Sequence, residues 1–203
     1  MNDIAAEVSS LVSEFDSDNP SLAADRLKDY WSQFETKSIG GIKAEKRNLQ
    51  ETAGALVPIL KKIANPIARG AEREPKRYRP LALLLWDQYG REGRVIAAIV
   101  LGKIELAEPE STIPIIRDLC RSCYTWEDAD RLAMDALEPV VRKQPEVWLS
   151  EIEPWLSDEN MWVRRAGITV AGRLPMKQSS LPTAAWAWQS LCSMISRKWS
   201  RKL

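Results

Sequence analysis

The sequence predicts an all-α fold built from stacked helical repeats. Nearly every segment between turn residues carries apolar residues with the period of an α-helix. Residues 94–104 (RVIAAIVLGKI) and 164–174 (RRAGITVAGRL) both begin with arginine and end in Val-x-Gly, a basic residue and an apolar residue. They lie 70 residues apart, and a helix of similar character at residues 131–141 lies between them. These spacings indicate a repeat of about 35–37 residues.

A repeat of this length is a little shorter than a typical HEAT or armadillo unit. Such units cannot bury their apolar faces alone, so we expect HEAT-like helical repeats stacked in a curved α-solenoid with a concave face. A globular helical bundle is the alternative. One domain is expected, with N-terminal helices and a loop in residues 1–45, core repeats in 46–176, and a divergent C-terminal cap helix in 177–203.

Helices are expected, in chain order, at residues 3–15, 21–34, 46–68, 81–90, 92–104, 112–123, 126–143, 147–156, 161–174 and 182–198. The chain breaks between helices contain glycine or proline: Gly40, Gly41, Pro80, Pro109, Pro145 and Pro175. The third helix is expected to bend or split near Pro58 and Pro66. Residues 94–101 have the β-branched content of a strand, but no second strand of similar quality is there to pair with it.

The composition limits the chemistry that the chain can perform. Its 203 residues include nine tryptophans and no histidine. A Ser-His-Asp triad, an imidazole base and a His-ligated metal are therefore excluded. Carboxylates, lysine, arginine, tyrosine, serine and thiols remain, and neither a cofactor nor a metal is expected.

The charge is unevenly distributed along the chain, although the formal net charge is only +1. Residues 160–203 hold eight of the 29 basic residues and no acidic residue, which leaves 21 basic against 28 acidic residues in the rest. A second basic stretch, residues 61–79, has seven basic residues against two glutamates. Such asymmetry is typical of a surface that binds an anion. Alternatively, the basic residues only lie on the solvent-exposed outer faces of helices.

Nothing in the sequence predicts export or a membrane span. The first 15 residues contain acids and no basic stretch, unlike a signal peptide. The longest uncharged segment, residues 178–196, contains many serines and glutamines, so it is too polar to cross a bilayer. With Trp186 and Trp188 it would suit an interfacial helix as a remote alternative. We expect a cytoplasmic monomer.

The cysteines are expected to be small buried apolar residues. Cys120 and Cys123 have C-x-x-C spacing, but a redox motif would open a helix after a strand. A zinc site would need four ligands, and Cys192 is the only other thiol.

One carboxylate in the helix at residues 126–143 stands out from its neighbours. At about 100° per residue, the apolar side chains of this helix fall within an arc of roughly 180°. Four acids fall outside the arc, as solvated charges should: Glu127, Asp128, Asp135 and Glu138. Asp130 falls inside it, four residues after Trp126. A partly desolvated carboxylate there is either paired with an arginine of the next helix or held for chemistry.

The start of the helix at residues 161–174 carries aromatic and basic residues together. Ser157 or Asp158 is suited to be its N-cap. Arg165 shares a face with Trp162 and Thr169. Aromatic and arginine side chains in one turn either pack against neighbouring helices and face solvent, respectively, or bind a phosphate together.

These residues together resemble the DNA alkylation repair family of HEAT-like glycosylases. The resemblance rests on Trp126-x-x-x-Asp130 and, 35 residues after the aspartate, on Arg165 within Trp162-x-Arg-Arg-x-Gly-Ile. The segments at residues 83–101 (LLLWDQYGREGRVIAAIVL) and 41–47 (GIKAEKR) are also similar to parts of that family. The similarity extends over roughly residues 22–176.

The resemblance implies a DNA glycosylase that binds duplex DNA in a basic groove and excises positively charged N3- or N7-alkylated purines without extruding the base. The cationic base is already a good leaving group, so a carboxylate need only stabilise an oxocarbenium-like sugar and position water. In this role Asp130 would be the catalytic carboxylate and Trp126 would pack against the deoxyribose. Arg165, with Arg164, would hold a phosphate beside the lesion.

Other contacts implied for the DNA involve Trp162, Trp186, Trp188 and Lys177. The family has a further tryptophan on a later helix, but neither Trp186, Trp188 nor Trp199 has its spacing. The alternative function is a non-catalytic HEAT-like scaffold that binds DNA or a protein partner. Convergence of Trp126, Asp130 and Arg165 on one basic concave face would favour the enzyme, and full burial of Asp130 in a salt bridge would weaken that interpretation.

Overall fold

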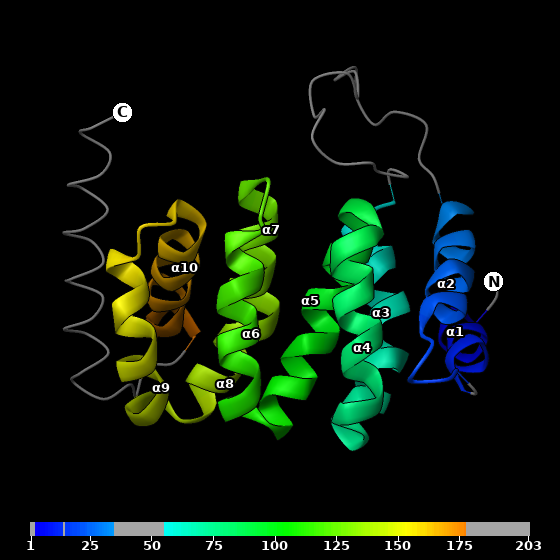
Figure 1. The fold of residues 1–203 in the computed structure, drawn as a ribbon, viewed down its shortest axis with the longest axis horizontal. Coiled ribbons are helices and arrows are strands. Elements are labelled where there is room, and N and C mark those ends of the chain that lie inside the picture. Colours follow the sequence, from blue (N-terminus) through cyan, green and yellow to red (C-terminus); the bar gives the residue numbers. More distant parts are fainter. Residues whose placement is uncertain (1–2, 14, 35–54, 178–203) are drawn as a thin grey trace, which may run out of the picture. The chain divides into compact units, whose positions relative to one another are not determined.

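The protein was analysed as a computed structural model that describes residues 3–13, 15–34 and 55–177, with side chains up to residue 174 (Figure 1). Every regular element in these ranges is a helix, which confirms the predicted all-α helical-repeat class. The chain divides into an N-terminal unit, residues 1–108, and a C-terminal unit, residues 109–203. Each unit is described by itself.

The N-terminal unit consists of α1 (Ile4–Val12), α2 (Ser21–Ser32), α3 (Val57–Arg73), α4 (Pro75–Gln88) and α5 (Gly90–Ala107). Asp3 caps α1, because its carboxylate accepts hydrogen bonds from the N–H groups of Ala5 and Ala6. Helix α5 packs against both α3 and α4, which also contact each other. The junction between α4 and α5 is a single tight turn at Gly90, whose φ of 62° is readily adopted only by glycine.

The apolar core of this unit lies between α3, α4 and α5. Its largest fully buried side chains include Leu60, Ile63, Ile67, Leu81, Leu85, Trp86, Ile96, Leu101 and Ile104. Arg94, the first residue of the repeat recognised in the sequence, is buried in this core. Its Nε donates to the carbonyl of Trp86 at 3.2 Å, and its guanidinium lies 4.8 Å from the centre of that indole.

The C-terminal unit begins with α6 (Pro109–Arg121) and α7 (Trp126–Arg131), which continues through the π-helical segment η2 (Leu132–Leu137) into α8 (Glu138–Lys143). It continues with α9 (Pro145–Ile152), the 3₁₀ helix η3 (Glu153–Ser157) and α10 (Met161–Lys177). Helix α10 contacts α6, α7, η2, α8 and η3. The similar segments 94–104 and 164–174 thus lie in α5 and α10, one helix in each unit.

The predicted turns at proline were wrong in position. Pro109 and Pro145 occupy the first turns of α6 and α9, where a missing N–H leaves no helical hydrogen bond unmade. Pro80 and Pro175 lie inside α4 and α10, so α4 starts earlier than expected and α10 extends beyond residue 174. Pro66 also lies inside a helix, α3, which continues to Arg73.

The π-helical turn in the C-terminal unit has a local cause. Pro139 is the second residue after it. A proline at this position has no N–H to donate to the carbonyl of Asp135, four residues earlier, and a proline ring in a helix clashes with that carbonyl. The wide turn rotates the residues after it relative to an ideal α-helix. The prediction that Glu138 is solvated was therefore wrong, because Glu138 is buried.

None of the helices among the described residues combines the length and the apolar character that crossing a membrane requires. The expected loop at residues 37–44 and the helix at residues 182–198 lie outside the described residues.

Candidate functional site

The centre of the site is an ion pair between α7 and α10. The Nε of Arg165 donates to Oδ1 of Asp130 at 2.8 Å, and its Nη2 donates to Oδ2 at 2.9 Å. The Asp130 side chain is 15% exposed and that of Arg165 is 44% exposed. Hydrogen bonding to Asp130 raises the pKa of Arg165 above its usual value. Of the two interpretations of Asp130 left open by the sequence, the structure therefore bears out pairing with an arginine, with the carboxylate still in reach of solvent.

Thr169 completes the surroundings of the carboxylate. Its Oγ1 donates to Oδ1 of Asp130 at 3.2 Å. Thr169 lies one turn after Arg165 on α10, so both residues reach Asp130 from the same face of one helix. This face was recognised in the sequence, but the role of Thr169 as a hydrogen-bond donor to Asp130 was not.

Trp126 lies at the start of α7, one turn before Asp130. Its side chain is exposed, and the guanidinium of Arg165 lies 5.9 Å from the centre of its indole ring. This distance allows a cation–π contact. The structure therefore brings Trp126, Asp130 and Arg165 together, and their roles toward DNA stay predictions.

Hydrogen-bonding capacity remains on both partners of the ion pair. Oδ1 of Asp130 accepts two hydrogen bonds and is filled, whereas Oδ2 accepts one and retains one acceptor position. Nη1 of Arg165 donates to no other described residue. The pair can thus bind a further donor through Asp130 and a further acceptor, such as a phosphate oxygen, through Arg165.

The position of Trp126 is fixed by a capping box. Thr125 is the N-cap of α7: its hydroxyl accepts from the N–H of Asp128, and the Asp128 carboxylate accepts from the N–H of Thr125 at 3.0 Å. Asp128 is consequently buried, which makes the prediction that it is a solvated charge wrong.

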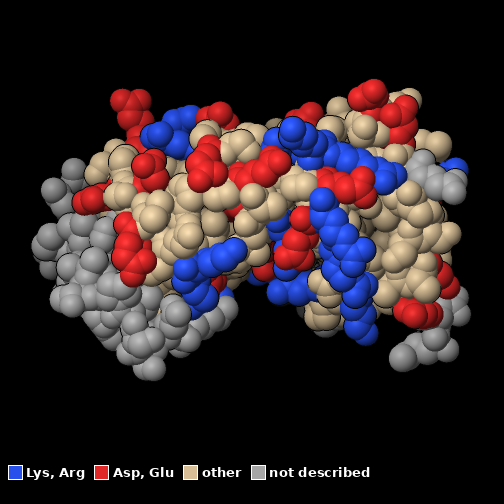
Figure 2. Space-filling view, turned by 90° about the horizontal axis from the view of Figure 1, so that it is seen from below, with Lys and Arg blue, Asp and Glu red and all other residues tan. Residues whose placement is uncertain are grey.

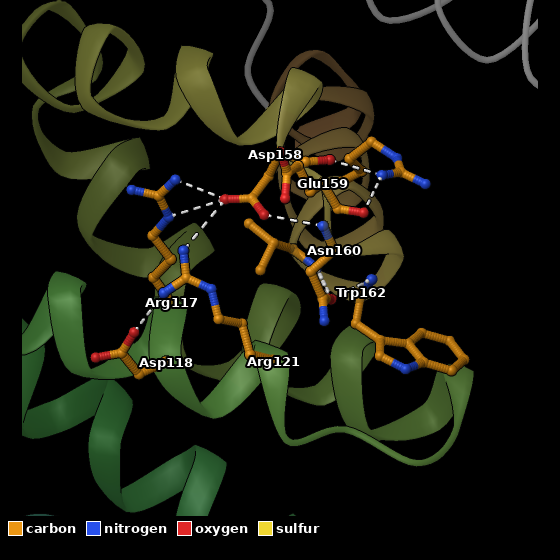
Figure 3. Close-up of polar contacts among 9 residues, drawn as sticks. Arg117, Asp118, Arg121, Asp158, Glu159, Asn160 and Trp162 are labelled. Atoms are coloured by element: carbon orange, nitrogen blue, oxygen red, sulfur yellow. Dashed lines mark hydrogen bonds and ion pairs between the residues drawn. The ribbon is translucent and has the colours of Figure 1, made fainter.

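The first turn of α10 is fixed by Asn160, not by Ser157 or Asp158 as the sequence suggested. Oδ1 of Asn160 accepts from the N–H groups of Trp162 and Val163, at 2.9 and 3.2 Å (Figure 3). Asp158 instead holds the backbone of the cap residue, because its Oδ1 accepts a hydrogen bond from the N–H of Asn160.

Two arginines of α6 hold Asp158 in place (Figure 3). Nε and Nη2 of Arg117 donate to its Oδ2 at 3.2 and 2.6 Å, and Nη2 of Arg121 lies 3.4 Å from the same oxygen. The Asp158 side chain is only 7% exposed. The N–H of Asn160 and the guanidinium of Arg117 lower the pKa of the Asp158 carboxyl. No sequence pattern indicated Arg117 or Arg121.

Arg164 does not join the Asp130 ion pair. Its Nη1 donates to the backbone carbonyls of Asp158 and Glu159 at 2.6 and 2.8 Å. Its neighbour Trp162 is half-buried, and in Figure 3 its indole points away from the α6 arginines. Arg164 thus stabilises the loop before α10. A phosphate contact by Arg164 or by Trp162 stays a prediction.

The basic character of residues 160–174 is largely balanced by acids of α7 and α8. Asp130 pairs with Arg165, and Glu138 pairs with both Arg173, at 2.8 Å, and Arg142. On the face shown in Figure 2, Lys and Arg side chains likewise lie beside Asp and Glu side chains. The three arginines among residues 160–174 are therefore all engaged within the C-terminal unit.

The remaining site predictions fall elsewhere. Trp186 and Trp188 lie outside the described residues, as does the side chain of Lys177. Cys120 and Cys123 are buried, as expected of small apolar residues.

Comparison with known proteins adds one finding. Residues 33–192 match the protein family described as DNA alkylation repair enzyme. Neither the curated proteins nor the solved structures include a significant match to the chain.

Proposed function

This chain belongs to the DNA alkylation repair enzyme family, and from that membership we propose that it is a DNA glycosylase. The family gives the chain a role in DNA repair. The proposed reaction hydrolyses the N-glycosidic bond of positively charged N3- or N7-alkylated purines in duplex DNA. The observation that carries the proposal is the joint location of Asp130, Arg165 and Trp126 at one partly exposed site.

In the proposed reaction the bond between C1′ of the deoxyribose and the base nitrogen breaks, and its electron pair neutralises the cationic base. The sugar becomes oxocarbenium-like, and a nearby carboxylate stabilises that positive charge electrostatically. Asp130 would supply the carboxylate through Oδ2, which retains an acceptor position. Water then attacks C1′ and releases a proton, leaving an abasic sugar.

The other two residues would position the DNA. The free Nη1 of Arg165 is suited to a phosphate oxygen beside the lesion. The exposed indole of Trp126 offers an apolar surface for the deoxyribose. None of these steps uses a histidine.

The Asp130–Arg165 pair itself favours a second candidate, a non-catalytic scaffold that binds DNA or a protein. In that function Asp130 would serve only to orient Arg165. A carboxylate already neutralised by a guanidinium stabilises a developing cation less than a free carboxylate does. For the glycosylase, the negative charge of the bound phosphate must therefore offset part of the guanidinium charge beside Asp130.

Release of 7-methylguanine and 3-methyladenine from alkylated duplex DNA separates the two functions. The wild-type protein should release free base, and Asp130→Asn should lower the single-turnover rate roughly 10²- to 10³-fold with little loss of DNA affinity. Asp118→Asn, which alters an exposed aspartate of α6, is the matched control. Absence of release by folded wild-type protein, together with retained duplex binding, would support the scaffold.

A further inference from the structure

We propose that a row of basic side chains on α3, formed by Lys62, Arg69 and Arg73, binds the phosphodiester backbone of duplex DNA. We call these three residues the α3 basic row. It lies in the N-terminal unit, whereas every residue assigned above to lesion chemistry lies in the C-terminal unit. The inference rests on the proposed function only in taking duplex DNA as the ligand.

The three residues share one face of α3. They are separated by seven and then four residues, so at about 100° per residue they fall within an arc of about 40°. The rise of about 1.5 Å per residue places Lys62 and Arg73 about 16 Å apart along the helix axis. The opposite face, which includes Leu60, Ile63 and Ile67, is buried in the core.

All three side chains are available to a ligand. Each is exposed, and none makes a hydrogen bond or ion pair with another described residue. This distinguishes them from Arg164, Arg165 and Arg173 of α10, whose guanidiniums are held by backbone carbonyls, by Asp130 and by Glu138.

The acids near the row have other basic partners. Glu72, which precedes Arg73 on α3, is 3.4 Å from Nζ of Lys103 on α5. Glu74, which follows Arg73, is paired with Arg77 at 3.5 Å. The positive charge of the row is therefore not cancelled by its neighbours.

A row of unpaired cations along about 16 Å of a rigid helix complements a line of phosphates better than a single anion. Flexible side chains of this kind contact phosphates without reading the base sequence. We therefore expect the row to contribute affinity that depends on salt and is independent of both sequence and lesion.

The test is a triple variant, Lys62→Gln, Arg69→Gln and Arg73→Gln. Glutamine has a helix propensity close to that of lysine and arginine, so α3 should persist, which an unchanged melting temperature verifies. The control removes the same number of charges from exposed positions on other helices: Arg26→Gln, Lys28→Gln and Lys143→Gln. Affinity is measured by fluorescence anisotropy on an undamaged duplex at several salt concentrations.

The expected result is a loss of affinity of at least about 10-fold at low salt. The slope of log Kd against log salt concentration should fall by about 2 to 3, since each lost phosphate contact removes about 0.9. The control should keep most of the wild-type slope. A triple variant whose slope matches that of the control would overturn the inference, as would a wild-type protein that does not bind duplex.

The base-release assay run in parallel separates this inference from the glycosylase. Release by the wild-type protein with an unchanged slope in the triple variant overturns the α3 basic row alone. A reduced slope in the triple variant, with no release by the wild-type protein, leaves the row supported and refutes the glycosylase.

Discussion

Asp130 and Arg165, 35 residues apart in the sequence, form a two-bond ion pair that joins α7 to α10, with N–O distances of 2.8 and 2.9 Å. The aspartate is the one acid of its helix that falls within the apolar arc predicted from the sequence. Its side chain is mostly covered, while the arginine remains 44% exposed and carries a free nitrogen. The pair is thus a fixed contact inside the unit and a cationic group at its surface.

The first prediction concerns the strength of this pair. Because the Arg165 side chain is 44% exposed, a double-mutant cycle with Asp130→Ala and Arg165→Ala should give a coupling free energy of only about 0.5–1 kcal/mol in urea unfolding. The coupling should shrink at high ionic strength. Additive single-variant effects at low salt would show that the pair does not exist in solution.

The second prediction concerns Thr169, which donates to Oδ1 of Asp130. Thr169→Val removes the hydroxyl at constant shape, so the proposed base release should slow roughly 10-fold, about 1.4 kcal/mol, with little change in KM. Thr169→Ser keeps the hydroxyl and should restore most of the rate. Equal rates for the valine and serine variants would remove Thr169 from the catalytic arrangement.

The third prediction concerns Asp158 and acid stability. Its pKa is lowered in the folded protein, so its stabilising contribution is present above the unfolded-state pKa of about 3.9 and is lost as pH falls through the folded value. Asp158→Asn should therefore lower the free energy of unfolding at pH 6 and flatten its decline below about pH 4.

The control for Asp158 is Asp118→Asn. Asp118 pairs with Arg121, as Asp158 does, but its side chain is 72% exposed. It should change the unfolding free energy by less than about 0.5 kcal/mol at any pH. An Asp158→Asn protein with the same acid profile as the wild type would contradict the role of Asp158 in the folded state.

The fourth prediction concerns Glu105 of α5, which is fully buried and has no hydrogen-bond partner for either carboxyl oxygen among the described residues. Burial raises its pKa well above the usual value. Stability should therefore be lost as pH rises above the unfolded-state pKa of about 4.3, by up to about 1.4 kcal/mol per pH unit, until the folded pKa is reached.

Glu105→Gln, which cannot ionise, should remove this loss. Its stability relative to the wild type should grow from pH 5 to pH 8 in thermal unfolding. Glu110→Gln, which alters an exposed glutamate of α6, should show no such trend. A constant difference between Glu105→Gln and the wild type across this range would mean that Glu105 does not ionise with a raised pKa.

The fifth prediction contrasts two tryptophans. Trp126 is 59% exposed, so Trp126→Ala should change the free energy of unfolding by less than about 1 kcal/mol while weakening duplex binding. Trp155 is buried, so Trp155→Ala should cost roughly 3–5 kcal/mol. Trp126→Phe, which keeps a ring, should bind DNA better than Trp126→Ala. Undiminished binding by Trp126→Ala would exclude the indole from the DNA interface.

Several parts of the fold were predictable because they depend on local patterns. Apolar residues at helical period identify α1, α2, α5 and α10 to within a few residues, because burial of one face follows from that period. Helix boundaries at proline were less predictable, since proline is compatible both with a turn and with a first helical turn. The predicted N-cap of α10 was wrong because Ser157, Asp158 and Asn160 all have side chains that suit this position. The structure shows that Asn160 is the N-cap and that Asp158 instead binds Arg117 of α6.

The sequence by itself determined that this protein is helical, that residues 94–104 and 164–174 form helices of similar sequence, and that Trp126 and Asp130 share one face of α7. Period and spacing decide such facts within a single helix. The tertiary structure decided which charge meets which: Arg165 with Asp130, Arg173 with Glu138, and Arg117 with Asp158. Pairing across helices depends on how side chains from separate segments pack, which local spacing does not encode. The arginines in the described part of the last quarter are therefore mostly paired, whereas Lys62, Arg69 and Arg73 of the α3 basic row make no such pair with the described residues.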